Sequence, residues 1–384
     1  MKQTIGIIFG GQSTEHDISI ITALSSVIKP LRADGKYSIV PIYVTKQGRW
    51  YADEKLADIS LFSSGRIDGF LETAKPVAVE LGDGLTLVKP GIRPTRTKVD
   101  IAFPAMHGTY GEDGSLMGLL RMANIPFVGC DLTASAIAMD KVTCKQVAAA
   151  AGISVAKSIH FSKNDSIEKL EDILDEAKHL TLPLFVKPAH LGSSIGITRV
   201  TSFEQLTNAI EVAAHYDDRI LVEEAVQNLI EVTVPVMGNE APRAALVEKP
   251  LAKPDEFFDF DTKYINNGGG KKSGGNKGAQ GYSELPADIP TSLYDAAVAT
   301  ALSVYKAVGC SGTARVDLLI DQKTKIIYFN ELNPLPGSLY AHNWQKAGIP
   351  PITLVNNLID FAVERFDSKK QLESTFSTSF LKQF

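Results

Sequence analysis

Residues 312–337 read GTARVDLLIDQKTKIIYFNELNPLPG, and we begin the interpretation of the fold from this stretch. Apolar residues dominate 312–321 and 325–332, and polar residues separate the two segments. This pattern is typical of two neighbouring strands. The stretch therefore predicts a strand pair near the end of the chain.

The predicted strand pair carries a cluster of polar side chains. Glu331 and Asn333 are two apart and share one side of a strand, and Asp317 on the neighbouring strand can face them. Two carboxylates and an amide oxygen suit Mg²⁺. Arg315 lies on the same side as Asp317 and suits a phosphate or an oxyanion. Taken alone, acidic residues on solvated strand faces would be the simpler explanation.

Strand-like and helix-like segments alternate along the chain, which indicates an α/β protein with α+β parts. Its 384 residues predict two or three domains. The first section resembles an open, mostly parallel sheet, and the middle section a small antiparallel unit. The expected strands are 4–9, 37–44, 99–104, 125–128, 184–187, 196–200, 220–224, 230–236 and 244–248. The expected helices are 18–28, 133–151, 203–214, 292–308 and 350–366, before a polar tail.

The overall composition excludes several classes of function. The net charge of -5 argues against a nucleic-acid-binding surface. No run of 18 apolar residues is present, so we expect no membrane span, and no signal peptide is recognisable. Cys130, Cys144 and Cys310 form no metal-binding motif, and their odd number argues against a disulfide framework. We therefore expect a cytoplasmic protein.

Residues 184–197 (LFVKPAHLGSSIGI) predict a strand that delivers Lys187, followed by a tight loop containing Ser193 and Ser194. Loops rich in N–H and O–H donors bind phosphate. Lys141, on a separate helix, could join Lys187 in holding a polyphosphate. By itself, Lys141 is better explained as an ordinary exposed helix lysine.

Residues 220–231 (ILVEEAVQNLIE) predict a strand that ends in acidic residues. Glu223 or Glu224 could accept a hydrogen bond from an adenine amino group, and Glu231 from a ribose hydroxyl. The spacing alone supports this only weakly.

Two glycine-containing turns lie in the first section. Residues 10–19 (GGQSTEHDIS) follow a strand and lack the dinucleotide motif G-x-G-x-x-G, and Glu15 there could hold an ammonium group. In 106–114 (MHGTYGEDG), His107 could contact a substrate or make a structural hydrogen bond.

The Gly- and Lys-rich segment 266–281 is longer than an ordinary loop. They do not fit the P-loop motif. They could form a flexible linker or a lid over a bound phosphate.

In combination and order, eight segments resemble the D-alanine–D-alanine ligase family of ATP-grasp enzymes. They are GGQSTEHDIS, HGTYGEDG, SAIAMDK, VKPAHLGSSIGI, VEEAV with IEV, DFDTKY, ARVDLL and NELNPLPG. The resemblance implies an amino-terminal Rossmann-like domain for substrate and two α+β domains that sandwich ATP. The implied limits are 1–130, 131–222 and 223–370, with a tail at 371–384.

The resemblance also implies roles for individual residues. The residues implied for ATP are Lys141, Lys187, Ser193, Ser194, Glu223, Glu224, Glu231, Lys263 and the backbone of Ala225 and Val226. Asp317, Glu331 and Asn333 would hold two Mg²⁺ ions, for which Mn²⁺ could substitute. Glu15 would bind the ammonium group of the first D-alanine, near His107.

Further implied roles concern catalysis. Glu15, Ser193 and Tyr264 would form a hydrogen-bonded set. Lys263 would reach the transferred phosphate, and Arg315 with the N–H of Gly337 would hold the tetrahedral oxyanion. His342 and Asn343 stand where relatives usually have Ser and Leu near the second substrate, so this pocket departs from the family pattern.

The implied reaction joins two D-alanines through an acyl phosphate, for peptidoglycan synthesis, in a cytoplasmic homodimer. An alternative is the same mechanism with another acceptor, such as D-lactate, D-serine or another amino acid. A non-catalytic nucleotide-binding module would not need Asp317, Glu331 and Asn333 together. A dehydrogenase would need the missing glycine motif.

Overall fold

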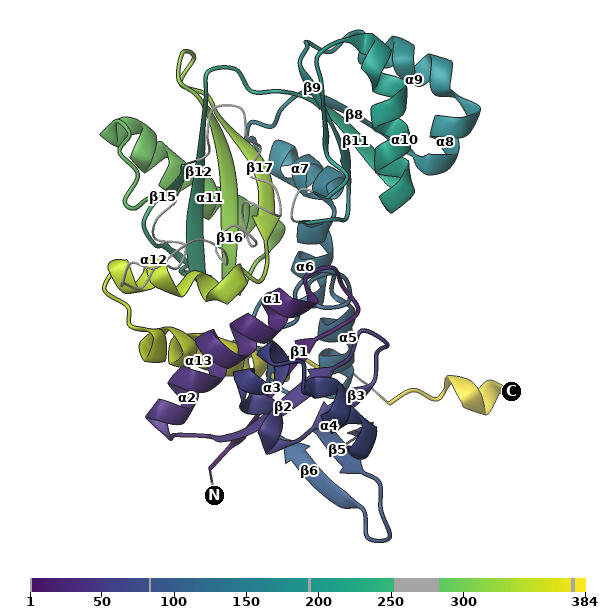
Figure 1. The fold of residues 1–384 in the computed structure, drawn as a ribbon, viewed down its shortest axis with the longest axis vertical. Coiled ribbons are helices and arrows are strands. Elements are labelled where there is room, and N and C mark those ends of the chain that lie inside the picture. The colour runs from purple at the N-terminus through teal and green to yellow at the C-terminus, as the bar shows by residue number, and fades with distance from the viewer. Residues whose placement is uncertain (1, 83, 193–194, 252–282, 374–376) are drawn as a thin grey trace.

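A computed structural model describes residues 2–82, 84–192, 195–251, 283–373 and 377–384. Ser193, Ser194, Lys263, Tyr264 and the loop 266–281 lie outside the described residues, so the predictions made for them stay predictions. The described chain forms three lobes (Figure 1). None of its helices has the length and apolar character needed to span a bilayer.

The amino-terminal lobe is built on a sheet of order β3-β2-β1-β7. Strand β1 pairs in parallel with β2 and β7, which confirms the predicted open, mostly parallel sheet. The expected strand 125–128 is reduced to a single parallel bridge between Ala102 and Phe127. The elements are β1 (Thr4–Gly10), α1 (His16–Ile21), a π-helical stretch (Thr22–Ile28), α2 (Lys29–Asp34), β2 (Ser38–Val44), β3 (Trp50–Ala52), α3 (Ile59–Ser63), α4 (Ile67–Thr73), β7 (Ile101–Pro104) and α5 (Ser115–Met122).

A second, antiparallel sheet in this lobe was not expected from the sequence. It consists of β4 (Ala78–Gly82), β5 (Gly84–Lys89) and β6 (Thr95–Val99). Leu85 and Leu87 on its buried side pack into a cluster with Val99 and Leu120. The sheet therefore extends the lobe without adding an apparent functional residue.

The prediction of a single helix at 133–151 is wrong, because the helix is interrupted at Asp140. Two helices form instead, α6 (Leu132–Met139) and α7 (Lys141–Ala150). Asp140 has an extended backbone (φ -101°, ψ 102°), and its carboxylate accepts hydrogen bonds from the N–H groups of Val142 and Thr143. It is thus the N-cap of α7 and fixes where that helix begins.

The central lobe has an antiparallel sheet of order β10-β9-β11-β8, as predicted for the middle of the chain. Side chains such as Val186 and Val222 on one face pack under α10 together with Ala209. Lys187 and Glu223 alternate with them and therefore lie on the other face. The elements are β8 (Ser158–Ser162), α8 (Lys163–Glu168), α9 (Leu170–Ala177), β9 (Leu184–Pro188), β10 (Thr198–Val200), α10 (Leu206–Tyr216) and β11 (Arg219–Glu224).

The carboxyl-terminal lobe has the order β13-β12-β16-β17, and its strand pair β16–β17 confirms the prediction from residues 312–337. Helices α11, α6 and α7 pack on one face of this sheet. The expected strand 244–248 is limited to β13 and an isolated bridge at Glu248. The elements are β12 (Leu229–Gly238), β13 (Arg243–Ala244), β14 (Lys249–Pro250), β15 (Ser283–Glu284), α11 (Thr291–Val308), β16 (Gly312–Asp321), β17 (Ile327–Asn333), α12 (Ala341–Lys346) and α13 (Pro351–Lys370).

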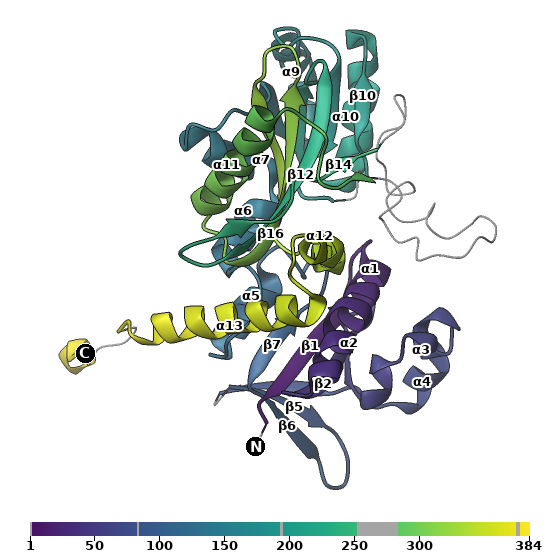
Figure 2. The ribbon, with the colours of Figure 1, turned by 90° about the vertical axis from the view of Figure 1, so that its left-hand side faces the viewer.

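The last long helix, α13, returns to the first lobe. Leu354 and Leu358 belong to the same buried cluster as Ile5 and Phe9 of β1. Figure 2 shows the beginning of α13 next to α2 and β1, from where the helix runs away from them toward the C-terminus. The predicted domain limits at 130, 222 and 370 stay a proposal, in which α13 falls within the third domain but shares the core of the first.

Candidate active site

The polar face of the carboxyl-terminal sheet gathers the predicted metal ligands. Asp317 on β16 is paired directly with Glu331 on β17, and Thr233 on β12 is paired with Asp317 from the other side. Directly opposed residues share a face. Thr233 donates a hydrogen bond of 3.1 Å to Asp317, and Asn333 approaches the same carboxylate at 3.4 Å. The structure thus brings the three predicted ligands together.

The donor set of this cluster fits a hard divalent cation. Asp317 and Glu331 are directly opposed on neighbouring strands and supply carboxylate oxygens on one face, and the amide of Asn333 adds a third oxygen. Arg315 also belongs to the cluster, with hydrogen bonds of 2.8 and 2.6 Å to Asp317. Its guanidinium lies over the ring of Tyr340, 5.5 Å from the centroid.

Helix α7 lies between the central and the carboxyl-terminal sheet and supplies two lysines (Figure 1). Lys145 donates to the carbonyl of Phe329 on β17 at 3.4 Å and forms an ion pair of 2.9 Å with Glu223 on β11. Lys187 on β9 pairs with the other oxygen of Glu223. Lys141 lies 3.6 Å from Glu331 and donates to the carbonyl of Leu191.

The environment of Glu223 differs from the prediction that it could accept from an adenine amino group. Only 2% of this residue is exposed. Burial raises its pKa, but Lys145 and Lys187 outweigh this and lower the pKa to about 2. Glu223 is therefore the shared counter-ion of two lysines, and its side chain offers a ligand almost no surface.

Two neighbouring residues that were predicted to bind the nucleotide have partners within the protein. Glu224 lies on the opposite face of β11 from Glu223 and accepts a hydrogen bond from the N–H of Thr181, so its side chain is directed away from the lysines. The N–H of Ala225 donates to the carbonyl of Pro183 at 2.9 Å and is already used. The carbonyl of Ala225 accepts from the side-chain amide of Gln227 at 3.1 Å, and the predicted nucleotide contact of Ala225 and Val226 stays a prediction.

Glu15 lies where the amino-terminal lobe meets the loop after β9. A Cβ atom added to Gly108 would lie 3.1 Å from a carboxylate oxygen of Glu15, and one added to Gly192 would lie 3.4 Å away. Two glycines from different lobes therefore leave space for this carboxylate. Ser193, predicted to contact Glu15, follows Gly192 directly.

His107 is buried, and its neighbours favour the structural alternative. Its Nε2 lies 2.8 Å from the hydroxyl of Thr22, which also accepts from the N–H of Ser338 at 2.9 Å. Burial lowers the pKa of His107, but Glu112, with a carboxylate 3.7 Å away, raises it above the usual value. Glu112 in turn accepts from the N–H of Leu335. This cluster joins the first lobe to residues 333–339.

The turn after Gly337 has an unusual backbone. Ser338, Leu339 and Tyr340 all have φ between 51° and 54°. Such conformations are costly for residues other than glycine and occur at functional sites. The turn orients the N–H of Ser338 toward Thr22 and the ring of Tyr340 toward Arg315.

His342 and Asn343 both contact a buried carboxylate, that of Glu248. Nε2 of His342 lies 3.0 and 3.1 Å from its two oxygens, and Ser283 donates to it at 2.6 Å. Asn343 is fully buried, because its side chain bonds both backbone groups of Leu246 and also Glu248. Asn343 therefore positions Glu248, and the contact predicted between Asn343 and a substrate stays a prediction.

Sequence reasoning missed Lys145, Glu248 and Thr22. Lys145 is four residues after Lys141, so a shared helix face was a usable signal. Glu248 and Thr22 gave no such signal, because their partners His342 and His107 are far away in sequence.

Comparison with known proteins places these residues in context. A family model described as "D-ala D-ala ligase N-terminus" matches residues 4–130, and one described as "D-ala D-ala ligase C-terminus" matches residues 147–360. A D-alanine–D-alanine ligase from Chlorobium limicola is 36% identical over 95% of this chain and 98% of its own length. One from Oceanobacillus iheyensis is 35% identical over 98% of this chain and 100% of its own.

Solved structures are similar over the same extent. The D-alanine–D-alanine ligase from Coxiella burnetii has a TM-score of 0.78 at 30% identity and covers 96% of both chains. The VanG D-Ala:D-Ser ligase from Enterococcus faecalis has a TM-score of 0.76 at 32% identity, covering 94% of this chain and 100% of its own. The similarity therefore includes all three lobes.

Proposed function

This chain belongs to the D-alanine–D-alanine ligase family, an ATP-grasp family, and from that premise we propose that it joins two D-alanines at the expense of ATP. The observation that carries the proposal is the convergence of Asp317, Glu331 and Asn333 on the sheet face toward which Lys141 reaches. A purely structural sheet face would not need this donor set. The product, D-alanyl-D-alanine, would serve peptidoglycan synthesis.

The first half of the reaction transfers the γ-phosphoryl group of ATP to the carboxylate of one D-alanine and releases ADP. Lys141 and Lys187 hold the negative charge of the phosphates, and Glu223 keeps Lys187 and Lys145 in place. Mg²⁺ held by Asp317, Glu331 and Asn333 would neutralise charge that develops on the phosphates.

The second half is attack by the amine of the second D-alanine on the acyl phosphate, with phosphate as the leaving group. Glu15 binds the ammonium group of the first D-alanine from the space between Gly108 and Gly192. Arg315 and the N–H of Gly337 stabilise the tetrahedral oxyanion, a contribution of about 3 kcal/mol for a typical donor. Exclusion of water protects the acyl phosphate from hydrolysis.

The second substrate would bind beside His342, whose imidazole is oriented by Glu248. This arrangement supports a carboxylate-binding role for His342, because an imidazole can donate a hydrogen bond to that group. We further propose that the enzyme works in the cytoplasm, where ATP is available, and that it forms a homodimer.

ADP release measured with Mg²⁺-ATP and single or paired amino acids tests the proposal, together with mass spectrometry of the product. D-Alanine alone should support turnover and yield the dipeptide. Turnover that requires D-serine, D-lactate or another second compound would show a different acceptor. Absence of turnover with every carboxylate offered would remove the ligase assignment.

A further inference from the structure

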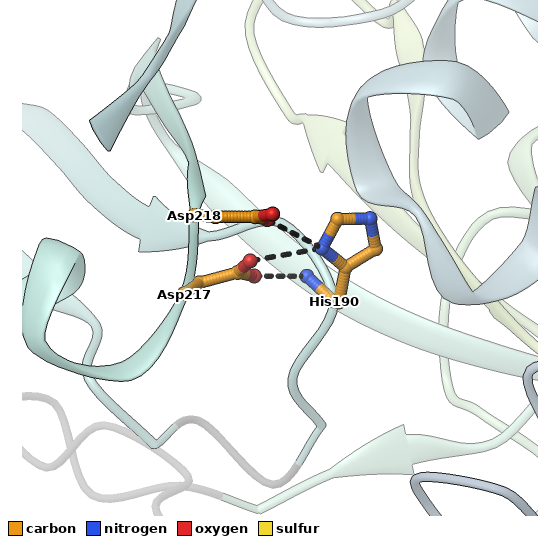
Figure 3. A group of neighbouring side chains, drawn as sticks. All are labelled: His190, Asp217 and Asp218. Carbon is orange, nitrogen blue, oxygen red and sulfur yellow. Dashed lines mark hydrogen bonds and ion pairs between the residues drawn. The ribbon is translucent and has the colours of Figure 1, made fainter. Parts of the chain in front are cut away.

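His190 lies in the loop between β9 and β10, three residues before Ser193. Figure 3 shows the carboxylates of Asp217 and Asp218 beside its ring, and Asp140 is a third carboxylate near it. Its Nδ1 is 2.9 Å from Asp217 and 3.9 Å from Asp218, and its Nε2 is 3.8 Å from Asp140. The group has the composition of a metal site. However, Asp217 and Asp140 raise the pKa of His190 to about 10, so its ring is a cation at neutral pH and a poor metal ligand.

The two closest carboxylates belong to elements that flank the nucleotide-binding residues. Asp140 is the N-cap of α7, the helix that carries Lys141 and Lys145. Asp217 ends α10 and precedes β11, the strand that carries Glu223. Arg219 also forms an ion pair with Asp140. His190 therefore connects the start of one nucleotide-binding element with the start of another.

The backbone around His190 is held by the same two elements. Ala189 donates to the carbonyl of Arg219 and accepts from the N–H of Lys141, both at 3.0 Å. The N–H of His190 donates to Asp217 at 2.7 Å, and Lys141 donates to the carbonyl of Leu191. Each residue from 189 to 191 thus has a defined partner.

We propose that His190 is a positioning residue, whose side chain between Asp140 and Asp217 fixes residues 189–192 against α7 and β11 and so sets the geometry for binding the ATP phosphates. This inference rests on the proposed function, because it assumes that Lys141 and Lys187 bind the phosphates. His190 itself acts through the backbone of the loop and through the cap of α7. Loss of its charge removes the cation that links Asp217 to Asp140, and Asp140 keeps only its ion pair with Arg219.

Binding of Mg²⁺ with a non-hydrolysable ATP analogue to the full chain, measured by calorimetry, tests this role apart from ligation. His190→Ala should weaken binding between about 10-fold and 100-fold, as expected when binding groups shift by about 1 Å. His190→Arg, which keeps a cation able to bridge two carboxylates, should restore most of the affinity. In kinetics, the KM for ATP should rise while the KM for D-alanine changes little.

Asp217→Asn and Asp218→Asn form a matched pair for the same measurement. The side chain of Asp217 is 6% exposed and that of Asp218 is 91% exposed, although they are neighbours. Asp217→Asn should weaken nucleotide binding as His190→Ala does, and Asp218→Asn should leave it unchanged. Circular dichroism of each variant monitors folding.

Unchanged nucleotide affinity in folded His190→Ala and Asp217→Asn would overturn the inference while leaving the ligase function intact. Failure of His190→Arg to restore affinity would equally argue against a bridging cation. Conversely, His190→Ala could weaken binding of the analogue while the unaltered enzyme makes no dipeptide. That result would support the inference and contradict the proposed function.

Discussion

Asp317 and Glu331 are direct cross-strand neighbours, one in the middle of β16 and the other near the end of β17. Their two negative charges lie on one face and are compensated by Arg315 on one side and Lys141 on the other. Like charges in such a position are unfavourable without a cation. The pair is therefore suited to binding Mg²⁺ together with the charged phosphates.

Removal of one of these charges should abolish turnover without unfolding the protein. For Glu331→Gln, ADP release should fall at least about 100-fold, because metal coordination contributes several kcal/mol to phosphoryl transfer. Asp295→Asn, on the exposed side of α11, is the control and should retain full activity. Near-normal ADP release by Glu331→Gln would remove the metal assignment.

Glu223→Gln should strongly destabilise the protein, because Lys145 and Lys187 would remain buried without a counter-ion. Breaking a buried ion pair from one side typically costs about 3–5 kcal/mol. Urea denaturation followed by circular dichroism measures the loss. Glu211→Gln on the exposed face of α10 should change the free energy of unfolding by less than about 0.5 kcal/mol. A loss below about 1 kcal/mol for Glu223→Gln would show that the two lysines do not depend on this carboxylate.

His342→Ser should change how the second substrate binds. With the imidazole removed, Glu248 loses the ring that its two oxygens contact, and we expect the KM for the acceptor D-alanine to rise about tenfold, equivalent to about 1.4 kcal/mol. Initial rates over a wide D-alanine range and product analysis with D-serine measure this. His179→Ser, at an exposed position of the central lobe, is the matched control. Unchanged acceptor preference and acceptor KM would exclude His342 from the specificity of the pocket.

The contribution of His190 to stability should depend on pH in a defined direction. Its pKa in the folded protein is raised from 6.5 to about 10, so the stabilisation is complete below about pH 6.5 and declines as the pH rises toward 10. Asp140, Asp217, Asp218 and Arg219 are the charged groups that face it.

The measurement compares unfolding of the unaltered chain and His190→Ala in urea between pH 6 and 10. The difference between their free energies of unfolding should shrink steadily over this range. A difference that stays constant would mean that the ring does not remain protonated in the folded state.

Local patterns predicted much of this fold. The strands at 312–321 and 220–224 have apolar residues at regular positions, and these residues are buried in the cores of the two sheets to which the strands belong. Strands β4 and β6 escaped prediction because most of their side chains are exposed and give no such pattern. The interruption of the helix at Asp140 was also not predicted, because the surrounding residues favour a helix. Only the N-cap residue of α7 separates α7 from α6.

The residues of the candidate site could likewise be predicted only in part from the sequence. Asp317, Glu331 and Asn333 could be grouped from the sequence, since strand alternation places them on one face. The pairing of Lys145 with Glu223 depends on how α7 packs against β11, which no local pattern reports. The same holds for Glu248 and His342, which are brought together by the turn after Gly337 and its left-handed backbone.

The packing of α13 on β1 has a consequence for biosynthesis. Ile5 and Phe9 are translated more than 300 residues before Leu354 and Leu358, which belong to the same buried cluster. The first lobe therefore cannot complete its core during most of translation, and a nascent chain must keep this apolar surface away from other chains in the meantime.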